Sequence, residues 1–143
     1  MSYFILDNSV SMRWHLESEK PSDQKYAESV LFSLSDTEAL VPSLWHLEAS
    51  NVLLAAERRG ETSIGEVERF IGQLENLPLH VDPHTANQSF SRIMALARAY
   101  KLSSYDASYL ELAMREGLPI ATLDKELTKA AKKAGVPLYL KNN

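Results

Sequence analysis

The sequence has no cysteine and little glycine or proline: its 143 residues include 5 glycines and 6 prolines. Without cysteine the chain can form neither disulfides nor thiolate metal sites, so any bound metal ion must use oxygen or imidazole ligands. This composition suits a reducing compartment, and we expect a cytoplasmic protein. No glycine- or serine-rich linker, internal repeat or low-complexity tract divides the chain. We therefore predict a single domain over residues 1–143.

Long hydrophobic runs are equally scarce. The apolar run YFIL at residues 3–6 ends at Asp7, so it is too short for a signal peptide or a membrane span. We expect no membrane association. The chain also lacks an excess of positive charge, because its formal net charge is −4. That balance argues against a general nucleic-acid coat protein, although it leaves room for a local basic track beside an acidic pocket.

What the sequence does contain is an alternation of short apolar runs and longer segments with helical periodicity. The short runs predict strands over residues 3–6, 39–41, 79–81, 119–122 and 136–140. The longer segments predict helices over residues 10–17, 21–34, 44–59, 63–77, 83–99, 103–116 and 124–134. Strands that alternate with helices form βαβ units, so we predict an α/β fold with a mostly parallel sheet covered on both faces.

Local signals support several of these helix boundaries. Ser9 is a candidate N-cap for the first helix, and Ser63 with Glu66 matches a capping box. Gly60 and Gly117 stand where helices should end, because glycine readily adopts the left-handed conformation after a last helical turn.

Four acidic residues stand just after predicted strands or early in predicted helices. Asp7 follows the first strand and Asp124 follows a later one. Asp106 lies in the first turn of its helix, and Glu48 lies one turn into another. In open parallel sheets ligands bind outside the carboxyl ends of the strands. We therefore expect all four side chains to reach the same edge of the sheet.

Each of these acids also has a purely structural explanation. Asp7 suits a turn, Asp124 suits an N-cap, and Asp106 completes a capping box that starts at Ser103. Glu48 suits a solvated helix position. The structural explanations weaken when the four are taken together, and Glu48 lies in a largely apolar helical segment where a carboxylate needs a partner.

A cluster of carboxylates predicts a bound cation. Neighbouring carboxylates repel one another and burial raises their pKa values, so the cluster should take up protons or a metal ion. All-oxygen ligation favours Mg²⁺ or Mn²⁺ over zinc, with Asp7, Asp106 and Asp124 as the expected ligands. Such an ion suits phosphodiester hydrolysis, with one or two ions bound.

Several segments, in their order and spacing, resemble PIN-domain ribonucleases, specifically the VapC-type toxins of prokaryotic toxin–antitoxin pairs. The matching segments are FILDNSV, SLWHLEASNVLLAAERRG, LSSYDASYLELAMREGLPIATLD and KKAGVPLY. The resemblance covers nearly the whole chain. It implies a three-layer α/β/α sandwich, a Mg²⁺- or Mn²⁺-dependent endoribonuclease acting on RNA, a homodimer, and inhibition by a cognate VapB-type antitoxin. The functional residues that it implies are Asp7, Glu48, Asp106 and Asp124, with Ser9, Asn51 and Thr122 in support.

Basic residues near these acids are candidates for contacts with RNA phosphates, namely Arg13, Arg58, Arg59 and Lys125. A solvated basic face explains them equally well. For the homodimer, we expect the helical segments at residues 30–34 and 64–77 to supply contacts between protomers.

Three other functional classes fit the sequence less well. A phosphotransferase of the haloacid dehalogenase type needs a second acid two residues after the first, where this chain has Ser9. A response-regulator receiver needs paired acids after the first strand, and Asn8 breaks that pair. A catalytically silent PIN domain that binds RNA or acts as a regulatory module remains the alternative to a nuclease.

Overall fold

The centre of the protein is a parallel sheet. The computed structural model describes residues 2–141. Its four strands lie in the order β3-β2-β1-β4 and every pairing is parallel. Their bounds are Tyr3–Leu6 (β1), Glu38–Pro42 (β2), Leu79–Asp82 (β3) and Ile120–Ala121 (β4). The predicted α/β class with a mostly parallel sheet is therefore confirmed.

Strand β1 is the point where the chain changes direction across the sheet. The chain moves outward from β1 to β2 and β3, and then returns to place β4 on the other side of β1. Ligand sites of open α/β sheets form at such a reversal, because the loops after the two central strands diverge there. The segments that follow β1 and β4 begin at Asp7 and Thr122. The topology thus places two of the predicted polar positions at the switch point.

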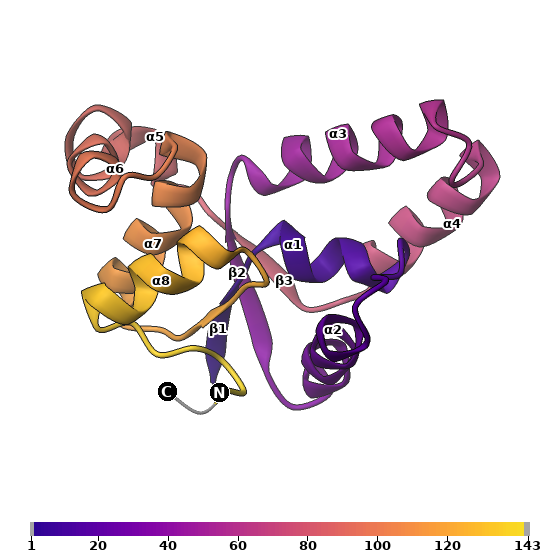
Figure 1. Cartoon of the computed structure of the whole chain (residues 1–143), viewed down its shortest axis with the longest axis horizontal. Coiled ribbons are helices and arrows are strands. Elements are labelled where there is room, and N and C mark those ends of the chain that lie inside the picture. Colours follow the sequence, from indigo (N-terminus) through magenta and orange to yellow (C-terminus); the bar gives the residue numbers. More distant parts are fainter. Residues whose placement is uncertain (1, 142–143) are drawn as a thin grey trace.

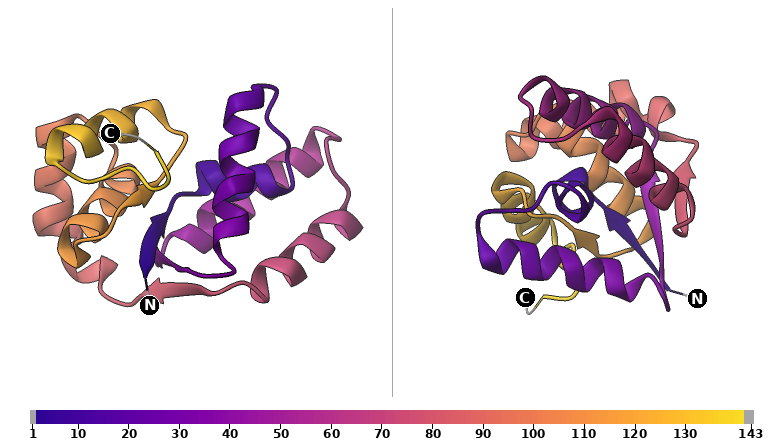
Figure 2. Two further views of the ribbon diagram at one scale, coloured as in Figure 1. Left: turned by 90° about the horizontal axis from the view of Figure 1, so that it is seen from below. Right: turned by 90° about the vertical axis from the view of Figure 1, so that its right-hand side faces the viewer.

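Helices cover both faces of the sheet, as Figures 1 and 2 show. Helices α5 to α8 lie on one side, where α7 packs against β1, β2 and β4. Helices α1 and α2 lie on the other side, and α3 and α4 extend away from the sheet as a two-helix arm. The helix bounds are Asn8–Ser11 (α1), Pro21–Ser33 (α2), Trp45–Arg58 (α3), Ile64–Glu75 (α4), Thr85–Gln88 (α5), Met94–Tyr100 (α6), Ser104–Glu116 (α7) and Lys125–Ala134 (α8). These helices and the sheet form the expected three-layer α/β/α sandwich.

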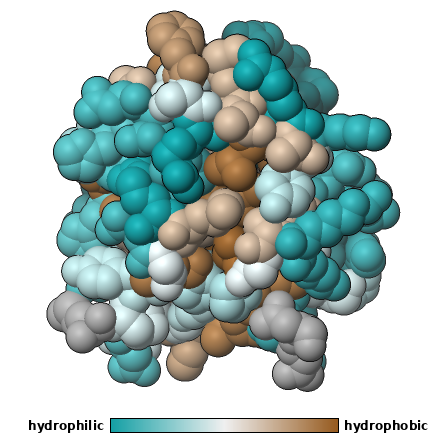
Figure 3. Space-filling view, turned by 90° about the vertical axis from the view of Figure 1, so that its left-hand side faces the viewer, coloured by the Kyte–Doolittle hydropathy of each residue, from teal (hydrophilic) through white to brown (hydrophobic). Residues whose placement is uncertain are grey.

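Burial on both faces explains why the sequence of β1 is a continuous apolar run. Phe4, Ile5 and Leu6 are all fully buried because helices pack on both faces of the strand. Figure 3 views the side formed by the last helices and shows a hydrophobic band between two hydrophilic flanks. Within residues 2–141, no helix combines the length and the apolar character needed to cross a bilayer.

The predicted helix ends are mostly confirmed. Ser63 and Glu66 form both hydrogen bonds of the capping box at the start of α4. Gly60, two residues after the end of α3, and Gly117, directly after α7, adopt positive φ angles of 73° and 65°, a conformation that costs glycine little.

The first predicted helix is shorter than expected. It begins at Asn8, with Asp7 at the N-cap, and after α1 it tightens into a 3-10 turn (η1, Met12–Trp14) rather than continuing to residue 17. Ser9 does not cap it, because its hydroxyl donates to the Asp7 carboxylate instead. The cap prediction was therefore wrong, while the side chain takes part in the candidate site described below.

Two further predicted elements differ in the structure. The helix expected over residues 83–99 is interrupted between α5 and α6 by a π-helical segment, η2, over Ser89–Ile93. The Ser89 hydroxyl donates to the Thr85 carbonyl, which offers that carbonyl a partner outside the regular helical ladder. The last strand, expected over residues 136–140, is reduced to one parallel bridge between Ile120 and Leu138. Because β4 has only two residues, it gives a further strand little backbone to pair with.

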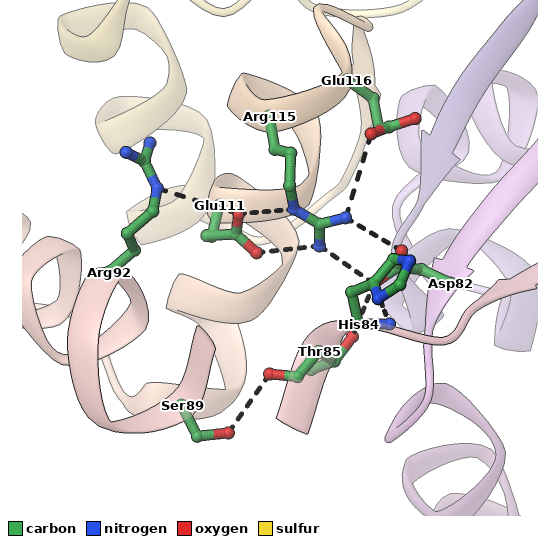
Figure 4. Close-up of polar contacts among 8 residues, drawn as sticks. All are labelled: Asp82, His84, Thr85, Ser89, Arg92, Glu111, Arg115 and Glu116. Carbon is green, nitrogen blue, oxygen red and sulfur yellow. Dashed lines mark hydrogen bonds and ion pairs between the residues drawn. The ribbon is translucent and has the colours of Figure 1, made fainter. Parts of the chain in front are cut away.

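A buried ion cluster joins the edge strand β3 to α7 (Figure 4). Arg115 donates to both carboxylate oxygens of Asp82 at 2.9 Å and to Glu111 at 2.8 and 3.0 Å. Arg92 of η2 approaches Glu111 from the other side at 4.0 Å. Burial alone would raise the pKa of Asp82, but the hydrogen bonds and charge of Arg115 outweigh it and lower that pKa. The cluster therefore fastens η2 and α7 to the edge of the sheet.

Candidate active site

Asp7 is the most enclosed of the four predicted acids. It is 6% exposed, and its Oδ2 atom accepts hydrogen bonds from Ser9 Oγ at 2.6 Å and Thr122 Oγ1 at 2.8 Å. Burial raises the pKa of Asp7 to about 6; the two hydroxyl groups oppose this rise, while the charges of Glu48 and Asp124 add to it. This environment costs the ionised form free energy, so Asp7 favours a proton or a cation.

Asp124 combines a capping role with a place beside Asp7. Its Oδ1 accepts the backbone N–H of Leu127 at 2.8 Å and caps α8. Its own backbone N–H donates to Thr122 Oγ1 at 3.0 Å, so the hydroxyl that binds Asp7 also holds the start of α8. The prediction that Asp124 caps a helix is thus confirmed. Asp124 is also a member of the acidic cluster.

Asp106 lies in the first turn of α7, where its backbone N–H donates to Ser103 Oγ at 3.1 Å. Burial, with the charges of Asp124 and Asp7, raises the pKa of Asp106 to about 6. Ser103 lowers it in part. A side chain that only capped the helix would gain from being ionised, because the helix N-terminus favours negative charge. Here burial, with the charges of the neighbouring acids, outweighs that effect.

Glu48 is half-buried in the first turn of α3 and is held by two residues that the sequence reasoning missed. Tyr109 donates its hydroxyl to Glu48 Oε1 at 2.6 Å, and Asn8 Nδ2 approaches the same oxygen at 3.5 Å. Burial raises the pKa of Glu48, these two hydrogen bonds lower it, and the charge of Asp106 raises it.

One sequence signal pointed to Tyr109. It lies three residues after Asp106, so the two residues share a face of α7. Asn8 had no comparable signal beyond following Asp7, because its partners Trp45 and Tyr109 come from distant elements.

The four acids form one electrostatic cluster, since each of them interacts with at least two of the others. Their side chains are not arranged as the ligands of a metal ion in this structure. Within residues 2–141, no three His, Cys, Asp or Glu side chains converge in an arrangement that could hold a metal ion. Mutual repulsion favours side-chain positions that keep carboxylate oxygens apart. The donor chemistry still fits a hard divalent cation, because all four groups are carboxylates and Asp7 and Asp106 have raised pKa values.

The other predicted residues differ in how close they lie to the four acids. Ser9 and Thr122 contact Asp7, whereas Asn51 is exposed on α3 and has no side-chain hydrogen bond within the described part of the chain. Lys125 directly follows Asp124 at the start of α8.

The three predicted arginines lie elsewhere. Arg58 and Arg59 end α3, about 15 Å along the helix from Glu48. Arg59 there pairs with Glu61 through two hydrogen bonds of 2.9 Å. Arg13 donates to the carbonyl of Leu16. Of the four predicted RNA contacts, Lys125 alone adjoins one of the acids in sequence.

The fold and the acidic edge together define a three-layer α/β/α domain with carboxylates at the switch point of its sheet. The model of the PIN domain family matches residues 4–133, and the chain therefore belongs to this family. PIN domains are typically nucleases and generally use divalent metal ions. Among solved structures, the chain is similar to PAE2754 from Pyrobaculum aerophilum, with a TM-score of 0.64 and 22% identity over 91% of this chain and 86% of that one. The search of curated proteins gave no match.

Proposed function

We propose that this chain is a cytoplasmic, metal-dependent endoribonuclease of the VapC type, the toxin component of a type II toxin–antitoxin pair. The observation that carries the proposal is the cluster of Asp7, Glu48, Asp106 and Asp124 at the switch point of the sheet, in a chain of a typically nucleolytic family. The sequence resemblance supports the narrower assignment to RNA and to the toxin class.

In this proposal the chain's own residues position the acids. Ser9 and Thr122 fix Oδ2 of Asp7. Tyr109 fixes Oε1 of Glu48. Asp7, Asp106 and Asp124 would hold Mg²⁺ or Mn²⁺. The bound ion would lower the pKa of a water molecule and neutralise charge that develops on the phosphodiester.

The test is cleavage of a 5′-labelled single-stranded RNA by the full chain in Mg²⁺, in Mn²⁺ and in EDTA. We expect cleavage with either metal ion, none in EDTA, and a loss of at least about 100-fold in Asp7→Asn and Asp106→Asn. Asp36→Asn is the matched control, because Asp36 is exposed in the turn after α2. Undiminished cleavage by either cluster variant in metal-containing buffer would overturn the assignment.

The absence of three converging acids within the described residues favours one second candidate, a catalytically silent PIN domain that binds RNA or regulates a partner. Calorimetric titration with Mn²⁺ separates the two functions. A nuclease predicts saturable binding that Asp7→Asn weakens, whereas a silent domain predicts RNA binding without either cleavage or a metal requirement.

The proposed antitoxin would act on the same cluster. An arginine of a VapB-type partner placed among these carboxylates would supply positive charge and make bidentate hydrogen bonds. It would also block access for RNA. Inhibition of cleavage by the cognate antitoxin, and its loss when that arginine is replaced, tests this step.

A homodimer is supported by large apolar side chains on the surface. Phe32 is 83% exposed, and Ile64 and Ile71 of α4 are 67% and 42% exposed. These residues fall in the two segments from which we expect protomer contacts. Sedimentation should show a dimer at micromolar concentration, and a monomer would count against this assignment.

A further inference from the structure

A groove rich in lysine runs between the start of α2 and one face of α8. It encloses about 390 Å³ and is lined by Lys20, Asp23, Leu123, Lys125, Thr128, Lys129, Lys132 and Lys141. We refer to this feature as the lysine groove. Three of its lysines, at positions 125, 129 and 132, follow the i, i+4, i+7 spacing that places them on one face of α8.

The lysine groove concentrates unbalanced positive charge. Its lining brings five ammonium groups together with one carboxylate, that of Asp23. Within residues 2–141, none of these lysines lies within 4.0 Å of a carboxylate oxygen; Lys141 instead lies over the ring of Tyr26, 4.3 Å from its centroid. Such a surface attracts a polyanion, and its attraction is strong for phosphates spaced along a strand.

Helix stabilisation does not explain the whole set. Lys132 lies in the last turn of α8, where the helix dipole favours a cation. Lys125 lies at the opposite end, in the first turn, where the same dipole disfavours one. A bound anion would offset that cost at Lys125.

The lysine groove adjoins the acidic cluster. Leu123, which lines the groove, donates its backbone N–H to Ser9 Oγ at 2.8 Å, and Ser9 in turn donates to Asp7. Asp124 immediately precedes Lys125 and caps the same helix. A strand lying in the lysine groove would therefore pass close to Asp124.

We infer that the lysine groove binds the phosphate backbone of the RNA strand next to the cleavage position, and this inference rests on the proposed ribonuclease function. The eight steps from Asp124 to Lys132 span about 12 Å of helix, enough for about three phosphates of a stacked strand. The contacts are to the backbone, so they position the RNA and do not select its sequence.

The test is the salt dependence of RNA binding by the full chain. A fluorescein-labelled single-stranded RNA of about 12 nucleotides, within the site sizes of single-strand binders, is titrated in EDTA at several KCl concentrations and followed by anisotropy. The double variant Lys129→Gln/Lys132→Gln should bind at least about tenfold more weakly at low salt, because two charge-assisted contacts are lost. Its slope of log K against log[KCl] should be smaller by about 1.4, at about 0.7 per contact.

The matched control is Lys25→Gln/Arg69→Gln, which removes two exposed positive charges outside the lysine groove. It should keep the affinity, the salt slope and the cleavage rate of the unmodified chain. Unchanged binding by the groove variant, equal weakening by the control, or tighter binding of polyglutamate than of RNA would each overturn the inference. A different result would show that the proposed function is wrong: the unmodified chain would not cleave RNA in Mg²⁺.

Discussion

The buried carboxyl group of Asp7 makes the stability of this protein depend on pH. Burial, opposed in part by the hydroxyls of Ser9 and Thr122, raises the pKa of Asp7 to about 6 from its ordinary value of 3.8. The folded chain therefore holds this proton more tightly than the unfolded chain does. The resulting stability is fully present below about pH 4 and is lost as the pH rises through about 6. At about 1.36 kcal/mol per pKa unit, the ionisation of Asp7 costs the folded state about 3 kcal/mol.

Replacing Asp7 with asparagine should remove this cost, because the side chain keeps its shape and loses its charge. In EDTA at pH 8 we expect Asp7→Asn to be more stable than the unmodified chain by up to about 3 kcal/mol, or up to about 10 °C in Tm. The gain falls short of that limit if the hydroxyls of Ser9 and Thr122 must turn to accept the new amide group. At pH 4 the two proteins should differ little. Urea titrations followed by circular dichroism measure both values.

Asp36→Asn is again the control, and it should leave the pH dependence of unfolding unchanged. The reasoning is refuted if the unmodified chain and Asp7→Asn lose stability in parallel between pH 4 and pH 8. Mg²⁺ gives a second measurement, since an ion that binds the folded cluster should stabilise the unmodified chain at pH 8 and act less on Asp7→Asn. No effect of Mg²⁺ on either protein would count against the metal site while leaving the argument on burial intact.

Three further predictions follow from other contacts. Asp82→Asn should lower the free energy of unfolding in urea by about 1.5–3 kcal/mol, because it removes the charged partner of two Arg115 hydrogen bonds while Arg115 keeps Glu111; a loss below about 0.5 kcal/mol would contradict this. Tyr109→Phe should slow RNA cleavage about tenfold by releasing Glu48, with KM little changed, and an unaltered kcat would show that the hydroxyl has no positioning role. Leu127→Ala, at a fully buried position of α8, should cost about 2–5 kcal/mol in the same urea assay, and a neutral result would mean that the site repacks.

The sequence by itself determined the features that depend on neighbouring residues. The apolar run of β1, the capping box at Ser63 and the left-handed glycines after α3 and α7 are local, and each predicted its element correctly. The alternation of strands and helices predicted the parallel sheet, because βαβ connections leave few other arrangements. With that topology, acids just after strands were bound to meet at one edge.

The tertiary structure decided what depends on contacts between distant segments. The hydrogen bond from Tyr109 to Glu48 joins residues 61 positions apart, and no local pattern specifies it. The lysine groove likewise combines residues from α2, α8 and the segment after α8. Distant contacts also explain two wrong predictions. The last strand is limited by pairing with the two-residue β4, and the Ser9 hydroxyl accepts the backbone N–H of Leu123, 114 positions away, instead of capping a helix. Local propensity sets which elements are available, whereas packing and long-range hydrogen bonds select which of them form and what their side chains touch.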